Sequence, residues 1–115
     1  AKLRTIPDEV TVYEVTGPLF FGAAEVIHDF KFTENTKVLL LRMRSVPAID
    51  ATAMNYMENL KTHCEKHGVT MVLSHVNEQP YKMMKKVHVV DRVGKENFCK
   101  DIDAAIARAE QVISE

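Results

Sequence analysis

An aspartate and a threonine stand two positions apart, at Asp50 and Thr52, where a loop gives way to a periodic apolar pattern. A carboxylate and a hydroxyl at such a point could present charge and a hydrogen-bonding group to a ligand or a partner protein. The simpler interpretation is a helix N-cap, because the side chain of Asp50 can accept free backbone N–H groups of the first turn. Both interpretations predict a helix that starts directly after Asp50.

A second constellation consists of His63, Cys64 and His67. Histidines four positions apart lie on one face of a helix, and imidazole and thiolate groups are common ligands of transition metals. The alternative is a pair of solvated histidines near a helix C-terminus, where positive charge is favourable. The spacing supplies no third and fourth ligand, although Cys99 and further histidines occur in the chain, so the sequence predicts no metal site.

Three segments follow predicted strands and lead into predicted helices: Gly17–Gly22, Ser45–Thr52 and Ser74–Asn77. In parallel α/β sheets such junctions share one edge, where backbone N–H groups at helix starts can hold a phosphate or a carboxylate. The glycine-rich signatures of nucleotide-binding loops are missing from the sequence. Nucleotide binding at these junctions therefore has weak support, and no cofactor is predicted.

A basic window begins with Lys82, Lys85 and Lys86 and extends to Lys100. It could face an acidic partner or anionic lipid headgroups, although the solvated face of an amphipathic helix explains the same pattern. No Ser-His-Asp or Cys-His arrangement of a known type accompanies it. The sequence therefore names no general base or nucleophile and predicts a protein that is not an enzyme.

The elements that must position these residues alternate between strands and helices. Strands are predicted at Val10–Val15, Val38–Met43, Val69–Val76 and, briefly, Glu96–Lys100. Helices are predicted at Phe21–Phe30, from Asp50 to His67, from Asn77 to Val87 and from Asp101 to Ile113. A loop or short turn is predicted at Val89–Gly94. The helices are marked by apolar residues at intervals of three and four, and the strands by β-branched and aromatic residues. This alternation predicts mostly parallel strands joined by right-handed crossovers.

Composition limits the class of protein. The chain has 115 residues, of which 46% are hydrophobic and 27% charged, as expected of one globular domain. Its net charge of −1 disfavours a nucleic-acid binder, which needs a basic surface. The two cysteines form no motif, which indicates unpaired thiols in a reducing compartment. No apolar run approaches the ~20 residues that span a bilayer, and the start at Ala1 indicates a processed N-terminus or a fragment of a longer protein.

Three stretches of the chain match a known pattern when they are taken in order. Val12–Ala24 (VYEVTGPLFFGAA), with its paired Phe20-Phe21, supplies a strand, a turn and a helix start. Val38–Met54 (VLLLRMRSVPAIDATAM) supplies a strand and the loop before a signature helix. Gly68–Met84 and Asp101–Ala109 supply the remaining strand and the last two helices. Together they resemble a STAS domain, the module shared by SulP-type sulfate/anion transporters and bacterial anti-sigma factor antagonists.

The resemblance implies a single STAS-like α/β domain over residues 1–115, with 1–9 as an N-terminal arm or edge strand. It implies a mixed, mostly parallel sheet of about four to five strands, flanked by about four helices. It also implies a non-catalytic regulatory domain at the cytoplasmic face of the cell membrane. The expected partners are a transporter membrane domain in the same polypeptide and a cytoplasmic regulatory protein.

One departure distinguishes the two branches of this family. Anti-sigma factor antagonists carry a phosphorylated serine or threonine directly after the aspartate, and the chain has Ala51 there. A kinase-driven switch at that residue is therefore excluded, which favours the transporter branch and leaves a soluble partner-switching protein as the alternative. The predicted partner or ligand surface comprises Pro18, Phe20, Asp50, Thr52, Ser74 and Asn77.

Overall fold

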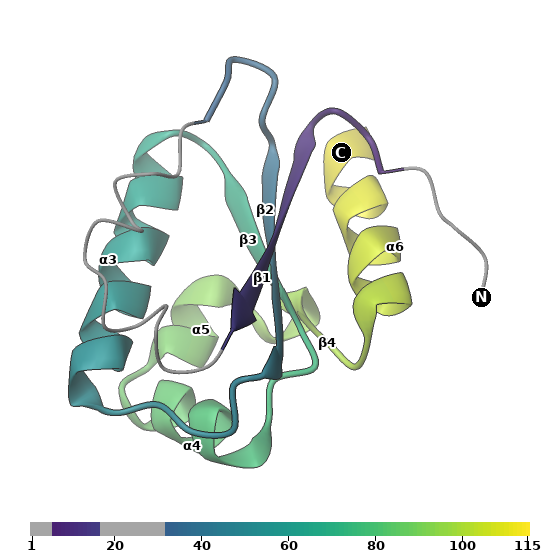
Figure 1. Cartoon of the computed structure of the whole chain (residues 1–115). Helices are drawn as coiled ribbons and strands as arrows, with labels where there is room; N and C mark the ends of the chain where they lie inside the picture. The colour runs from purple at the N-terminus through teal and green to yellow at the C-terminus, as the bar shows by residue number, and fades with distance from the viewer. Residues whose placement is uncertain (1–5, 17–31) are drawn as a thin grey trace.

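The computed structural model describes residues 6–16 and 32–115, and in this part of the chain four parallel strands form one sheet (Figure 1). The strands are β1 (Val10–Thr16), β2 (Val38–Ser45), β3 (Thr70–Ser74) and β4 (Phe98–Cys99), and they lie side by side in the order β1-β2-β3-β4. Each neighbouring pair is parallel. This confirms the predicted α/β class and its mostly parallel sheet.

Strand β2 lies at the centre of the fold because both of its faces are covered. Val38, Leu39, Leu40 and Leu41 have no exposed surface, which explains why this strand is a continuous apolar run rather than an alternating one. Side chains at even and odd positions enter two separate cores, one on each face of the sheet.

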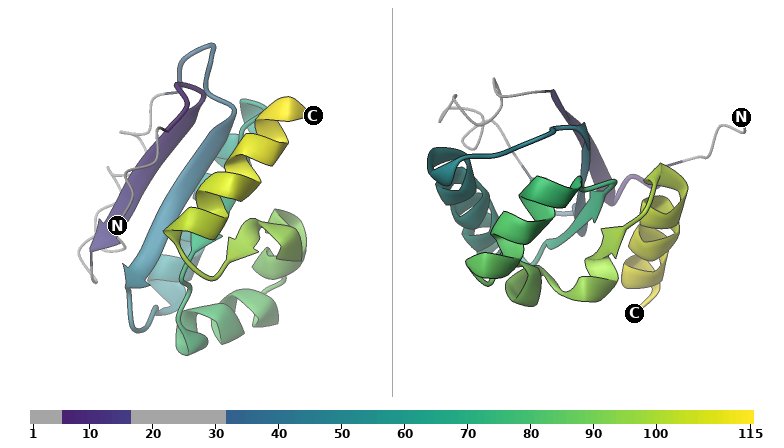
Figure 2. Two further views of the ribbon diagram at one scale, coloured as in Figure 1. Left: turned by 90° about the vertical axis from the view of Figure 1, so that its right-hand side faces the viewer. Right: turned by 90° about the horizontal axis from the view of Figure 1, so that it is seen from below.

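Helices cover both faces of the sheet, as the two views in Figure 2 show. The larger core contains residues of α3 (Ala51–Lys66), α4 (Glu78–Lys86) and α5 (Val89–Val93). The smaller core is closed by α6 (Ile102–Ser114), whose Ala105, Ile106 and Ala109 pack against Leu40 and Val72. The two layers of helices enclose the sheet as expected for alternating strands and helices.

The starts of α3 and α6 are fixed by aspartate caps, as the sequence predicts. Asp50 Oδ1 accepts the backbone N–H of Ala53 at 2.8 Å, and Asp101 Oδ1 accepts that of Ala104 at 2.8 Å. At its other end α3 stops at Lys66, and Gly68 follows with φ of +66°. A left-handed residue at this point is the usual helix C-terminal signal.

Two predicted elements differ from the structure. Val89–Gly94, predicted as a loop or short turn, instead contains α5, which follows a left-handed His88. Its five residues are too few to show a helical period, and burial of Val89, Val90 and Val93 in the larger core holds it in place. The predicted last strand over Glu96–Lys100 shortens to β4, which a single 3₁₀ turn, η1 (Lys95–Asn97), precedes.

The structure describes only some of the residues on which the N-terminal predictions rest. A turn in which the backbone N–H of Val10 donates to the carbonyl of Pro7 at 3.0 Å leads into β1, and residues 6–9 form no strand. The predicted helix at Phe21–Phe30, the junction Gly17–Gly22 and residues 1–5 lie outside the described residues.

Candidate functional site

The carboxyl ends of the parallel strands form one edge of the sheet, which we call the rim and define as residues 46–52 and 74–79. Asp50 and Thr52 lie at the rim where β2 leads into α3, and Ser74 and Asn77 lie there where β3 leads into α4. Thr16 pairs with Ser45, so the chain also leaves β1 at this edge. The predicted site residues Pro18 and Phe20 lie outside the described residues.

The two halves of the rim are joined by side chains at the start of α4. Asn77 Nδ2 donates to the backbone carbonyls of Arg44 and Val46, at 3.2 and 2.9 Å. The amide of Gln79 donates to the carbonyl of Ile49 at 3.1 Å and accepts the N–H of the same residue at 2.8 Å. Three of these hydrogen bonds satisfy backbone groups of the loop between β2 and α3, which has no regular structure of its own, and the fourth satisfies the carbonyl of Arg44 near the end of β2.

Asp50 is engaged in the helix it starts, while Thr52 faces outward. One carboxylate oxygen of Asp50 accepts the N–H of Ala53, which supports the N-cap interpretation. Ala51 and Thr52 are exposed in the first turn of α3. The Thr52 side chain is therefore within reach of a molecule that approaches the rim.

A groove of about 430 Å³ runs from the rim between α3 and α4. It is lined by Ala51, Thr52, Met54, Asn55, Glu58, Met83 and Val87. Met54 is buried, and Met83 and Val87 are half-buried. Apolar side chains in the floor and polar side chains at the margin are typical of a surface that binds another protein.

Ser74 and Asn77 differ in access although both belong to the predicted surface. The side chain of Ser74 points to the α6 side of the sheet, in register with Arg42 on β2 and Cys99 on β4. Ser74 is only 2% exposed. Asn77 is half-buried, and its side chain donates two hydrogen bonds to backbone carbonyls. In the described structure Asn77 therefore orders the rim.

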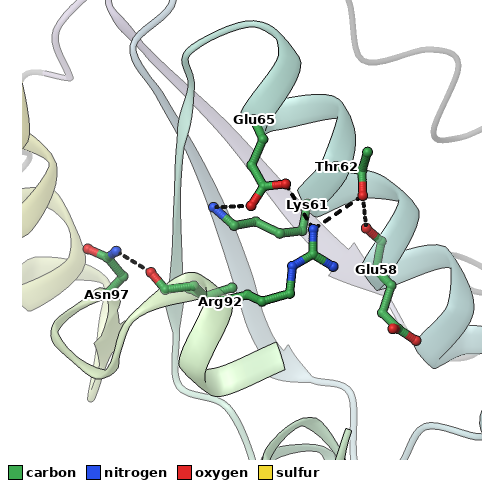
Figure 3. A network of polar contacts seen from close by, with 7 residues as sticks. Glu58, Lys61, Thr62, Glu65, Arg92 and Asn97 are labelled. Atoms are coloured by element: carbon green, nitrogen blue, oxygen red, sulfur yellow. Dashed lines mark hydrogen bonds and ion pairs between the residues drawn. The ribbon is translucent and has the colours of Figure 1, made fainter. Parts of the chain in front are cut away.

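The predicted basic window splits into exposed lysines and an arginine tied to a neighbouring helix. Lys82, Lys85 and Lys86 are exposed on α4, and Lys82 pairs with Glu78 at 3.0 Å. Arg92 of α5 instead reaches α3, where its Nη2 lies 2.9 Å from Glu65 (Figure 3).

Figure 3 shows the network that joins α5 to α3. Arg92 Nη2 also donates to the Thr62 hydroxyl at 3.2 Å, and Lys61 Nζ lies 3.9 Å from the second carboxylate oxygen of Glu65. On the far side of α5, Asn97 Nδ2 donates to the carbonyl of Val93 at 2.7 Å. Arg92 and Thr62 are 30 positions apart, as are Gln79 and Ile49, so sequence patterns gave no signal for these contacts. The pairs Lys61–Glu65 and Val93–Asn97 are each only four positions apart.

Neither cysteine has the character of a nucleophile. Burial raises the pKa of the Cys64 thiol from 9.0 to about 12, and burial also raises the pKa of the half-buried Cys99. Both thiols are therefore protonated at neutral pH, and a protonated thiol is a poor nucleophile.

Two further findings concern metal ligands and membrane-spanning helices. Within residues 6–16 and 32–115, no three or more His, Cys, Asp or Glu side chains come together as metal ligands. Among the same residues, no helix has both the length and the apolar character that a membrane crossing requires.

Comparison with known proteins gives a consistent result. The family model of the STAS domain matches residues 2–105. Among curated proteins, the "Putative sulfate transporter YvdB" of Bacillus subtilis (strain 168) is 25% identical over 92 residues, which are 77% of this chain. The matched region is 17% of that protein's length, so the chain corresponds to a small part of it.

Solved structures extend the comparison to the fold. A sulfate transporter family protein from Wolinella succinogenes is 34% identical, with a TM-score of 0.84 over 97% of this chain and 93% of that one. The STAS domain of a SulP transporter from Vibrio cholerae is 30% identical, with a TM-score of 0.81 over 96% and 88%. A putative anti-sigma factor antagonist from Thermotoga maritima shares the fold, with a TM-score of 0.68 over 95% and 92% and 16% identity.

Proposed function

The chain belongs to the STAS domain family, and from that premise we propose that it is the interaction domain of a SulP-type sulfate/anion transporter. In this proposal it acts through protein contacts and not through catalysis. The similarity to a SulP transporter STAS domain and to a protein named as a sulfate transporter supports the transporter branch.

The observation that carries the proposal is the ordered rim with its adjoining groove. Asn77 and Gln79 hold the loop before α3 through three hydrogen bonds to its backbone and a fourth to the end of β2. A surface that is ordered before binding loses less conformational entropy when a partner docks. Thr52 and Asn55 at the margin would supply polar contacts, and Met83 an apolar one.

We propose that the partner at this surface is the transporter's membrane domain, in the same polypeptide and on the cytoplasmic face of the cell membrane. The length comparison supports this, because the curated relative extends far beyond the region that matches this chain. A separate cytoplasmic regulatory protein is the second partner of the proposal. Residues 1–115 would then form one STAS domain, with residues 1–9 as its arm.

The alternative is a soluble partner-switching protein like the anti-sigma factor antagonists, which share the fold. Ala51 disfavours this alternative, because it occupies the position expected to be phosphorylated and has no hydroxyl group. The full reading frame separates the two functions. A frame that encodes about ten or more membrane-spanning helices supports the transporter, and a frame for a free-standing domain contradicts it.

The experiment that tests the rim uses two Asn→Arg substitutions in the full-length transporter. Asn55→Arg puts a long cation into the groove margin, and Asn35→Arg puts the same side chain in an exposed turn at the other end of the sheet. Because only the first change obstructs the proposed surface, we expect sulfate flux into vesicles to fall at least threefold for Asn55→Arg and to stay unchanged for Asn35→Arg. Equal flux for the two variants, at equal amounts of protein in the membrane, would contradict the proposal.

A further inference from the structure

Helix α4 carries three lysines that the proposed function does not use. Lys82, Lys85 and Lys86 are all exposed, and their spacing of three and four residues places them on one face of the helix. Pro80 and Met84 are buried on the opposite face, which packs against the rest of the protein. The lysine face, which we define as Lys82, Lys85 and Lys86, is therefore turned to solvent.

Most of the positive charge on the lysine face is unpaired. Lys82 Nζ lies 3.0 Å from Oε1 of Glu78, but both side chains are exposed, so water weakens this ion pair. Within the described residues, Lys85 and Lys86 make no ion pair and no side-chain hydrogen bond. Three lysines against one glutamate leave the exposed side of α4 with a net positive charge.

Charge is also unevenly distributed along the chain. Residues 78–100 hold six lysines and arginines against three aspartates and glutamates, whereas the rest of the chain holds nine against thirteen. The net charge of −1 thus combines a basic segment with an acidic remainder. Because Arg92 is paired with Glu65, the unpaired positive charge of the basic segment belongs to exposed lysines.

The position of the lysine face relative to the rim indicates what it contacts. Figure 1 shows α4 at the end of the molecule to which the strands β1 and β2 lead, and α4 begins within the rim at Glu78 and Gln79. The next step rests on the proposed function, in which the rim contacts the membrane domain. Lipid headgroups around that domain then lie beside α4.

We propose that the lysine face of α4 lies against the anionic lipid surface of the membrane. Anionic headgroups attract lysines close to the membrane, and the attraction falls off within a Debye length. Lysine suits this contact, because its ammonium group is a hydrated point charge on a flexible stem and needs no fixed arrangement of acceptors.

An acidic segment of a protein is the competing occupant of this face. The exposed residues of α4 are all charged or polar: Glu78, Gln79, Lys82, Lys85 and Lys86. Protein interfaces have a buried core in which charged residues, and lysine in particular, are depleted. The composition of the lysine face therefore favours a lipid surface over a protein segment.

The test measures binding of the 115-residue chain to lipid vesicles by co-sedimentation at pH 7.5. Vesicles of phosphatidylglycerol and phosphatidylcholine in equal parts are compared with vesicles of phosphatidylcholine alone. We expect at least tenfold tighter binding to the vesicles that contain phosphatidylglycerol at about 50 mM NaCl, and loss of most of this difference at about 500 mM NaCl, because salt screens the attraction.

Two double variants separate the lysine face from the net charge of the chain. Lys85→Gln with Lys86→Gln removes two charges from the lysine face and should weaken binding to phosphatidylglycerol vesicles at least fivefold. Lys37→Gln with Lys66→Gln removes two exposed lysines, at the start of β2 and the end of α3, at the opposite end of the molecule. This control changes the net charge equally and should keep the affinity of the unmodified chain to within about twofold.

The proposal is overturned if the α4 variant, with an unchanged circular dichroism spectrum, binds as tightly as the unmodified chain, if the control variant loses as much, or if phosphatidylglycerol makes no difference. Binding to poly-glutamate without binding to vesicles would assign the face to an acidic protein segment and overturn it too. The rim is tested separately, by sulfate flux with Asn55→Arg. A flux effect without vesicle binding would contradict the lipid contact alone, and vesicle binding without a flux effect would contradict the rim alone.

Discussion

The side-chain amide of Gln79 makes a reciprocal pair of hydrogen bonds with the backbone of Ile49, accepting at 2.8 Å and donating at 3.1 Å. The two residues belong to different junctions of the fold, since Ile49 precedes α3 and Gln79 lies in the first turn of α4. The pair therefore fixes the relative position of the two helix starts that flank the groove.

Replacing Gln79 tests how much this pair contributes. Gln79→Ala removes both hydrogen bonds and leaves the N–H and C=O of Ile49 without these partners, so we expect the free energy of unfolding to fall by about 1–2 kcal/mol. Urea denaturation measures the change. Lys85→Ala, at an exposed position of the same helix, should change stability by less than about 0.5 kcal/mol. Equal stabilities for the two variants would show that the pair does not hold the rim.

The aspartate caps can be tested in the same way. Asp50→Ala and Asp101→Ala each remove an acceptor of a first-turn N–H, and each should lower the free energy of unfolding by about 1 kcal/mol. Asp50→Asn keeps an oxygen acceptor and should recover most of the loss. If the alanine and asparagine variants at position 50 unfold at the same urea concentration, capping is not the role of this side chain.

Several features of the fold and of the rim could be predicted from the sequence, and others could not. The caps at Asp50 and Asp101, the end of α3 near Gly68 and the buried strand β2 follow from local residue types and periodicity. The shared edge of Asp50, Thr52 and Asn77 follows from the alternation of strands and helices. The hydrogen bonds of Gln79 could not be predicted, because they join residues that are distant in the sequence. Helix α5 could not be predicted either, because its formation depends on burial in the larger core.

The ion pair between Arg92 and Glu65 joins α5 to α3, and a double-mutant cycle measures its strength. Both side chains are partly exposed, at 35% and 47%, so solvent screening limits the coupling energy to about 0.5–1 kcal/mol. We expect Arg92→Ala and Glu65→Ala to be non-additive by that amount in low salt, and less so in about 1 M NaCl. Full additivity at low salt would mean that the contact makes no net contribution to docking α5.

Buried Cys64 gives stability a dependence on alkaline pH. The thiol ionises above about pH 9 in the unfolded chain but, because burial raises its pKa, only near pH 12 in the folded one. The contribution of the protonated Cys64 thiol to the free energy of unfolding is complete below pH 9. It is lost as the pH rises toward 12, by up to about 1.4 kcal/mol per pH unit.

Comparison with Cys64→Val isolates this effect from other groups that titrate in the same range. Valine cannot ionise, so the unmodified chain should lose more stability than the variant between pH 8 and pH 10.5 in urea denaturation. Parallel pH profiles for the two proteins would contradict the assigned pKa.

Hydrogen–deuterium exchange tests the central claim, that the rim and its groove are the surface by which this domain contacts the rest of a transporter. The comparison is between the isolated domain and the same residues in the full-length protein. We predict slower exchange in the full-length protein at residues 46–58 and 78–87, and unchanged exchange along the outer face of α6 and in the turn at 33–36. Added protection along α6 or at that turn, with none at the rim, would contradict the account.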